Sequence, residues 1–205
     1  ITHNGVEALA RALMCSHSIT RLSLGDNQLG DTGTTTLANA LQTNKSVQVI
    51  DLSNNNVGYE GAQALTTVLR NTTTLTKLNL ARNNLRDAGT RALGSALEKN
   101  QSVSELNLSS NSIGEEAGKA LLLSLRDNAA LFTAHFPFNR NDDSTAVVEL
   151  RPASDGGVEL RGQNLGDWGA CIVAEVLQHN TSITRLNLRN NGIGDEGDKA
   201  IAEAL

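Results

Sequence analysis

The sequence predicts an α/β repeat array, in which each unit contributes one short strand and one helix. One apolar position recurs every 28 residues, at Leu24, Leu52, Leu80, Leu108 and Phe136, and Leu160 and Leu188 continue the series after a shorter step. The residue two places before each of these is also apolar, and this alternation indicates a strand that buries one face. Self-similarity at a fixed period of this length is typical of repeat proteins.

The first predicted element is a helix within residues 1–17, and four regular units follow in residues 18–128. Their strands are expected near residues 21–24, 49–52, 77–80 and 105–108, and their helices near 32–43, 60–70, 88–99 and 116–127. Each helix is predicted from apolar residues at positions i, i+1, i+4 and i+5, as in Gly89–Leu97, which form one stripe. Acidic residues cluster at the expected helix starts, at Asp31, Asp87, Glu115, Asp167 and Asp195. They suit the positive end of the helix dipole and the free amides there.

A carboxamide side chain follows each apolar marker by three residues. These residues are Asn27, Asn55, Asn83, Asn111, Asn139, Gln163 and Asn191. A turning backbone leaves buried N–H and C=O groups without partners in a sheet, and a carboxamide can satisfy both kinds of group. We therefore expect a ladder of hydrogen-bonded amides along the array.

The combined pattern resembles the leucine-rich repeat. Residues 103–114, VSELNLSSNSIG, match the strand segment LxxLxLxxNxI/LG, and GxxALxxAL helices follow it. The match is closest to the long-repeat subclass typified by the ribonuclease inhibitor, RanGAP and the repeat domains of NOD-like receptors. The resemblance implies an α/β leucine-rich-repeat solenoid, or horseshoe, with a parallel sheet on the concave face and helices on the convex face. It spans residues 1–205 as a single domain with seven strand segments.

Residues 131–157 form an irregular unit that is four residues short. It contains all three phenylalanines, Phe132, Phe136 and Phe138, and both prolines, and it lacks the helical stripe. Pro152 argues against a regular helix, and Val147–Leu150 fits either one helical turn or an extended piece. The aromatic side chains have two interpretations: they fill the space of a shrunken helix, or Phe132 and Phe138 contact a partner. Phe136, at a core position, favours packing.

The ends of the chain fall inside units, since Ile1 aligns with Leu29 and Leu205 aligns with Leu177. Neither end has the polar outer face that terminal repeats need. We therefore expect this chain to be a segment of a longer array.

Composition narrows the function classes. The net charge is −5, from 17 basic and 22 acidic residues, which argues against nucleic acid as the main partner. No apolar run of about 18 residues is present, so no membrane span is expected. Cys15 and Cys171 lie several units apart and cannot pair, and free thiols predict a reducing, cytoplasmic location.

Four Asn-x-Ser/Thr sequons, at Asn44, Asn71, Asn100 and Asn180, allow a second interpretation, glycosylation in a secreted protein. Their recurrence just after each helix favours instead a left-handed C-terminal cap, which asparagine tolerates.

The sequence contains no catalytic or metal-binding motif that survives inspection. The four histidines and two cysteines show no metal-ligand spacing. Residues 114–119, GEEAGK, have too few residues between the glycines for a phosphate loop and lack the following Ser or Thr. We expect no enzyme activity, cofactor, metal or small-molecule substrate.

The predicted concave face is polar and mixed in sign, so it is either a solvated sheet face or a binding surface. The candidate partner-binding residues are Arg161, Arg185, Arg189, Glu159, His135 and Lys77 on this face, Arg82 on its rim, and Phe132 and Phe138 in the irregular unit. Arg161 and Arg185 are expected to face each other on adjacent strands, with Arg189 nearby. Such a cluster predicts a protein partner with an acidic surface.

The leading hypothesis is therefore a non-enzymatic protein-interaction scaffold, which the sequence does not separate into an immune-sensor repeat domain or a cytoskeletal or ciliary component. The alternative, implied by the resemblance to RanGAP, is a GTPase-activating protein that uses rim residues such as Arg82 and Asn54. An inhibitor role like that of the ribonuclease inhibitor is disfavoured, because that protein is cysteine-rich with an acidic concave surface. An assay of GTP hydrolysis by small GTPases, with and without this chain, separates the first two.

Overall fold

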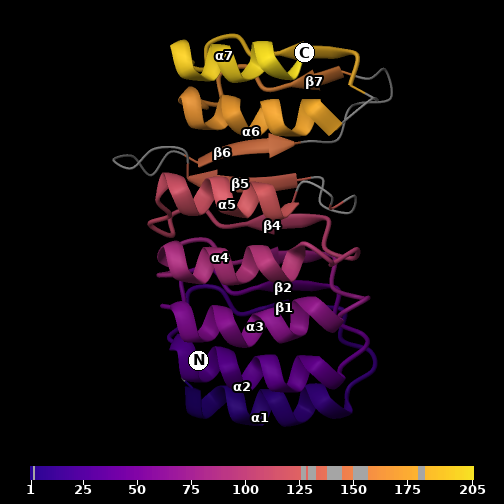
Figure 1. Cartoon of the computed structure of the whole chain (residues 1–205). Coiled ribbons are helices and arrows are strands. Elements are labelled where there is room, and N and C mark those ends of the chain that lie inside the picture. Colours follow the sequence, from indigo (N-terminus) through magenta and orange to yellow (C-terminus); the bar gives the residue numbers. More distant parts are fainter. Residues whose placement is uncertain (2, 126–127, 129–132, 138–144, 150–156, 180–182) are drawn as a thin grey trace.

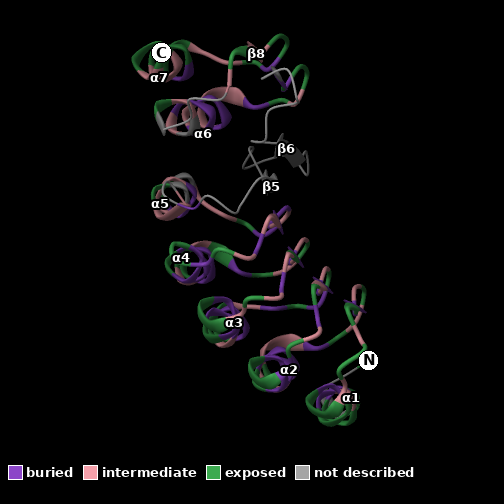
Figure 2. Ribbon diagram, turned by 90° about the vertical axis from the view of Figure 1, so that its right-hand side faces the viewer, coloured by how far each residue is buried: buried purple, intermediate pink, exposed green. Residues whose placement is uncertain are grey.

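The computed structural model describes residues 1, 3–125, 128, 133–137, 145–149, 157–179 and 183–205. Its helices are α1 (His3–Cys15), α2 (Gly30–Thr43), α3 (Tyr59–Asn71), α4 (Arg86–Leu97), α5 (Glu115–Leu125), α6 (Gly166–His179) and α7 (Asp195–Ala204). Its strands are β1 (Arg21–Ser23), β2 (Val49–Asp51), β3 (Lys77–Asn79), β4 (Glu105–Asn107), β5 (Thr133–Pro137), β6 (Thr145–Glu149), β7 (Gly157–Glu159) and β8 (Arg185–Asn187). The helices stack in one layer and the strands in another (Figure 1). The helices form the outer side of the arc and the strands its inner side (Figure 2).

The register of the parallel strands follows the sequence period. Leu22 lies opposite Ile50, Ile50 opposite Leu78, and Leu78 opposite Leu106. Each of these central residues is buried while its neighbours in the strand are more exposed. The core is therefore a continuous strip of aliphatic side chains between the two layers, which confirms the α/β leucine-rich-repeat fold.

The sheet departs from the prediction of one parallel sheet at the irregular unit. β6 pairs with β5 in the antiparallel direction, so Val147–Glu149 are extended rather than helical. β7 and β8 then form a separate two-stranded parallel sheet. The expectation fails here because residues 145–149 lack the spaced apolar stripe of a helix and alternate as a strand does.

The predicted amide ladder is present and joins successive units. Nδ2 of Asn55, Asn83, Asn111 and Asn191 donates to the carbonyl of the marker leucine one unit earlier, at 2.8–2.9 Å. Oδ1 of Asn83 in turn accepts from the backbone N–H groups of Asn55 and Val57. Asn27 bonds only within its own unit, to the carbonyls of Leu24 and Gly25. Asn139 lies outside the described residues.

A second amide ladder lies at the other end of the helices. Nδ2 of Asn44, Asn100 and Asn128 donates to the carbonyls of Leu13, Leu69 and Leu97 at 2.6–2.8 Å, and all three asparagines are buried. The prediction of left-handed caps after the helices is wrong at Asn44, whose backbone is extended (φ −72°, ψ 132°). These carboxamides cap the final carbonyls of the helix in the preceding unit. The carboxamides of two sequon residues, Asn44 and Asn100, are thus occupied within the core.

Three acidic residues at helix starts stabilise the following helix rather than their own. Oδ1 of Asp31 accepts from the N–H groups of Gly58 and Gly61, at 2.6 and 2.9 Å, at the start of α3. Asp87 contacts the start of α5 and Asp167 the start of α7 in the same way. The expected match between acids and free helix amides is confirmed, but it joins two units, so each contact also fixes the spacing of neighbouring helices.

We expect Asp31→Ala to lower the free energy of unfolding by about 0.5–2 kcal/mol, because two N–H groups at the start of α3 lose their acceptor. The matched control is Asp195→Ala, since Asp195 is exposed in the first turn of α7. It should cost only a few tenths of a kcal/mol. Denaturant titration of both variants measures the difference. Equal losses would contradict a specific role for the contact between units.

Candidate partner-binding surface

The inner face of the array carries the side chains that the strands turn away from the core. Arg21 and Ser23 are exposed on either side of buried Leu22, and Lys77 is exposed beside buried Leu78. This follows from the two-residue period of a strand, which alternates side chains between its faces. The predicted concave face is thus formed by the residues expected from the sequence.

A column of polar residues at the middle of this face is held by the backbone. Oδ1 of Asp51, Asn79, Asn107 and Asn187 accepts from the N–H two residues later, at 2.9–3.2 Å. These side chains therefore have a fixed orientation before any partner binds, which lowers the entropic cost of binding. Sequence reasoning placed them on the face but missed this bond, for which the recurrence of Asp or Asn between the two strand apolars was the signal.

The candidate residues of the regular units lie apart from one another. Lys77 and Glu105 face each other in adjacent strands and form an ion pair with Nζ 2.5 Å from Oε2. Both side chains are substantially exposed, so this pair contributes little to stability. Arg82 is exposed on the rim with a left-handed backbone (φ 55°), and its N–H donates to the carbonyl of Ser109. Nothing in this geometry brings Lys77 or Arg82 together with the candidates near the C-terminal end.

Arg161, Arg185 and Arg189, which we call the arginine cluster, are all exposed on the sheet side of the last two units. The register corrects the expected pairing: Arg185 lies opposite Gly157 rather than Arg161. Arg161 is instead in phase with Arg189, and the N–H of the adjacent Gly162 donates to the Arg189 carbonyl at 2.9 Å. The error arose because Arg161 lies four residues after Gly157 along the strand line.

Glu159 lies among these arginines. Its Oε2 accepts from Nδ2 of Asn187, directly opposite it in β8, at 2.7 Å. Asn187 in turn accepts from the N–H of Arg189. The carboxylate is thus fixed by a neutral amide, and three cations surround one anion on this part of the face.

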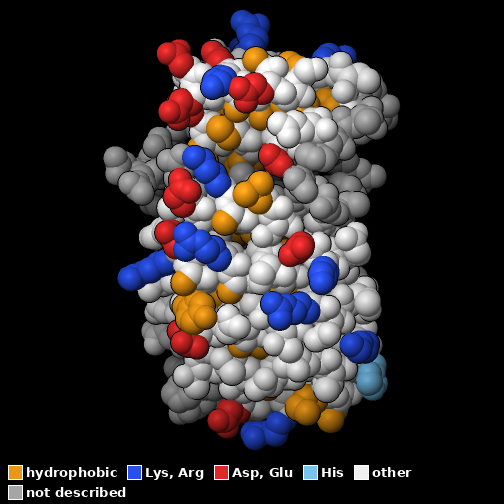
Figure 3. All heavy atoms as spheres, in the orientation of Figure 1, with side chains coloured by type: hydrophobic (Ala, Val, Ile, Leu, Met, Phe, Trp, Pro, Cys, Tyr) orange, Lys and Arg blue, Asp and Glu red, His pale blue; other side chains and the backbone are white. Residues whose placement is uncertain are grey.

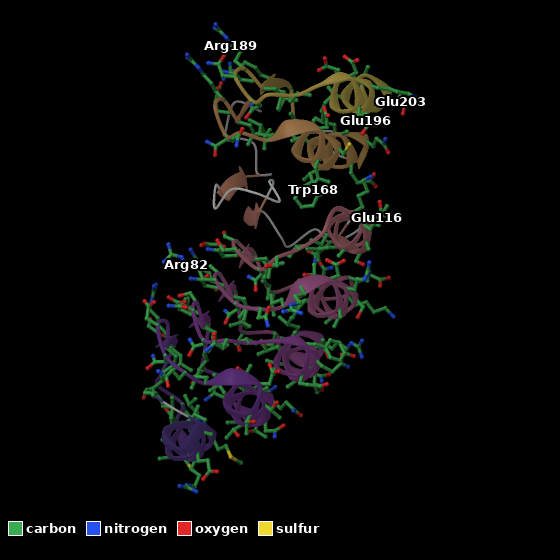
Figure 4. All side chains as sticks on the ribbon, turned by 90° about the vertical axis from the view of Figure 1, so that its left-hand side faces the viewer. Arg82, Glu116, Trp168, Arg189, Glu196 and Glu203 are labelled. Atoms are coloured by element: carbon green, nitrogen blue, oxygen red, sulfur yellow. The ribbon has the colours of Figure 1, made fainter. Side chains whose placement is uncertain are left out.

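The two sides of the C-terminal units differ in charge. On the helical side, α7 exposes Asp195, Glu196, Asp198 and Glu203, with Lys199 among them. Figure 3 looks onto that side and shows acidic side chains gathered at the upper end. Figure 4 shows Arg82 and Arg189 projecting from the strand side, opposite Glu116, Glu196 and Glu203 on the helices. This separation gives the C-terminal end a basic inner face and an acidic outer face.

The remaining candidates belong to the irregular unit. His135 lies in β5 with its backbone opposite Asn107 of β4, so it occupies a position on the inner face. Phe132 and Phe138 lie outside the described residues, and their assignment as contact residues stays a prediction. In the part of the chain that the structure describes, no helix is both long and apolar enough to cross a membrane.

Known structures with the same fold include two domains of named proteins. Leiomodin-1 Actin-Binding Site 2 (ABS2) matches with a TM-score of 0.60 at 21% identity, over 66% of this chain and 79% of that one. The tropomodulin C-terminal domain from Caenorhabditis elegans matches with a TM-score of 0.56 at 17% identity, over 67% of this chain and 84% of that one. A search of curated proteins found no match.

The family model described as Leucine Rich repeat matches residues 15–38, 43–65, 71–94, 99–122 and 179–202. These stretches cover more than half of the chain and coincide with strand and helix units of the structure. The ribonuclease-inhibitor-like subclass stays a prediction. The chain belongs to the leucine-rich repeat family.

Proposed function

We propose that this chain is a non-enzymatic protein-binding module whose inner face at the C-terminal end meets an acidic surface on its partner. The observation that carries the proposal is the arginine cluster, in which three exposed guanidinium groups accompany a single carboxylate that a neutral amide holds. Arginine is enriched at protein interfaces because its planar group forms paired hydrogen bonds with carboxylates. The irregular unit, with Phe132 and Phe138, is the second contact region in this proposal.

The charge separation supports this choice of face. An acidic partner is repelled by the acidic side chains of α7 and attracted by the arginines on the opposite side. Complementary charge of this kind steers encounter and suppresses wrong orientations more than it adds affinity. The partner should therefore approach along the strands, with the polar column of β2–β4 as an extension of the contact.

Actin is the first partner that we propose to test, and a cytoplasmic, cytoskeletal role is the corresponding setting. The support is the printed name of one structure with this fold, leiomodin-1 Actin-Binding Site 2. The GTPase-activating alternative stays a prediction with no specific observation in its favour.

The test measures binding of the chain to monomeric and filamentous actin by co-sedimentation and fluorescence anisotropy. The variant Arg161→Ser, Arg185→Ser, Arg189→Ser should fold normally, because all three side chains are exposed, and should bind at least about tenfold more weakly at low salt. The matched control is Arg11→Ser, Arg70→Ser, Arg91→Ser, which removes three exposed charges from the helical side. Absence of wild-type binding excludes actin, and equal weakening by both variants would contradict a specific role for the inner face.

A further inference from the structure

The helices of the array are of two alternating kinds. α2, α4 and α6 each begin at a residue with a left-handed backbone, and an aspartate follows at once: Gly30-Asp31, Arg86-Asp87 and Gly166-Asp167. α3, α5 and α7 each follow a glycine whose N–H donates to that aspartate: Gly58, Gly114 and Gly194. We call the first kind type A and the second type B. Each A helix is thus joined to the B helix after it.

The irregular unit does not count in this alternation. α5 is of type B, and α6, the next helix among the described residues, is of type A. If residues 131–157 were a regular unit that had lost its helix, they would occupy an A position and α6 would be of type B. The observed order is the order expected if α6 followed α5 directly.

The spacing of the leucines gives the length of the interruption. Leu108 and Leu160 are 52 residues apart, which is one period of 28 plus 24 residues. Removing residues 133–156, which are 24 residues, would place Gly157 where Thr133 now stands and restore the period. Phase and helix type therefore agree on the same boundary.

The contact between α5 and α6 supports their direct succession. A Cβ on Gly118 of α5 would lie 1.9 Å from Cζ2 of Trp168 in α6, so the indole packs directly against this glycine. In the regular pair α3 and α4, the corresponding positions also meet: a Cβ on Gly89 would lie 3.3 Å from Cβ of Ala62. Gly118 corresponds to Ala62, and Trp168 directly precedes the counterpart of Gly89. Figure 4 shows Trp168 between the two helices.

We propose that residues 133–156 are an insertion that wedges apart the strand side of one otherwise continuous array. β5 and β6 add two strands on the inner side, while the helix layer passes from α5 to α6 without a helix between them (Figure 2). Trp168 fills the helix layer at this junction, against the small Gly118. The wedge separates the arginine cluster from β4. Without it, Glu159 would lie opposite Asn107 and Arg161 beside Ser109.

The first test deletes residues 133–156 and follows thermal unfolding together with the fluorescence of Trp168, which is the sole tryptophan. We expect one cooperative transition and an emission maximum as blue-shifted as in the full chain, because α5 still packs against Trp168. Deletions of residues 133–154 and 131–156 are the controls, since each is out of phase by two residues. Both should unfold at lower temperatures. Equal melting of all three deletions, or a red-shifted emission in the in-phase variant, would overturn the proposal.

A second test uses the full chain and does not depend on the folding of a deletion. Gly118→Ala should shift the Trp168 emission and lower the melting temperature by at least about 2–4 °C. Gly5→Ala is the control, because its Cβ would meet only the side chain of exposed Ile1, at 3.1 Å. Unchanged emission in Gly118→Ala would show that α5 and α6 are not packed as adjacent units. Neither test uses a partner, so both are independent of the proposed function.

Discussion

Replacing Leu80 by alanine should lower the free energy of unfolding by about 2–5 kcal/mol, the largest loss expected from a single substitution considered for this chain. Leu80 is 0% exposed, and it occupies the marker position of the third strand segment. Removing its side chain leaves a cavity between the sheet and the helices. Because each unit of a solenoid is stabilised only by its neighbours, the units on both sides should lose stability with it.

Leu123→Ala is the matched control for this effect. Leu123 lies in α5 but is 61% exposed, so its truncation buries no cavity and should change the unfolding free energy by less than about 0.5 kcal/mol. Urea titrations of the two variants give the comparison directly. A loss at Leu80 no greater than that at Leu123 would mean that the marker leucines do not form the core.

Asn111→Ala should cost about 1–3 kcal/mol through loss of hydrogen bonds in the core. The side chain is fully buried, and its Nδ2 donates to the carbonyls of Leu80, Leu108 and Ser109. Alanine leaves these carbonyls without that donor in a place that water does not reach. The same change at Asn83 should cost a similar amount, since its amide makes five bonds although it is partly exposed.

The control for the amide ladder is Asn39→Ala on the exposed side of α2. Alanine is the better helix former, so this change should be neutral or slightly stabilising. Guanidinium titration of the three variants compares them under one condition. If Asn111→Ala were as stable as Asn39→Ala, the carboxamides would not be essential connectors between units.

The regular units could be predicted closely because each element is fixed by residues near in sequence. The 28-residue spacing from Leu24 to Leu108 determines both the strand positions and their register, since a parallel neighbour at the same phase buries the same face. The amides of Asn55 and Asn111 were predictable for the same reason: each backbone turn recurs with the same unsatisfied carbonyls.

Contacts that depend on the distance between units could not be predicted in the same way. The partner of Asp31 is an N–H 27 residues away, and the sequence shows only that Asp31 begins a helix. The ladder of Asn44 and Asn100 was obscured by Thr72 at the intervening position, where Oγ1 accepts from the N–H groups of Thr74 and Leu75. Pairing of β6 with β5 is a tertiary choice that short apolar runs do not specify.

The arginine cluster was found from the sequence, but its geometry was not. Predicting that Arg161 faces Arg185 required the register of β7 with β8, and that register places Arg161 in phase with Arg189. The bond between Asn187 and Glu159 follows from the same pairing. The assignment of the cluster to a partner contact remains the central proposal.

The rate of association with labelled actin, measured by stopped-flow fluorescence as the salt concentration rises, tests that proposal most directly. If the arginine cluster steers an acidic surface, the wild-type rate should fall by about tenfold or more as screening shortens from about 30 Å to about 8 Å, and the triple serine variant should be slower and nearly independent of salt. The helical-side control should follow the wild type. A triple serine variant that associates at the wild-type rate throughout would contradict the account and move the contact elsewhere, first to Phe132 and Phe138.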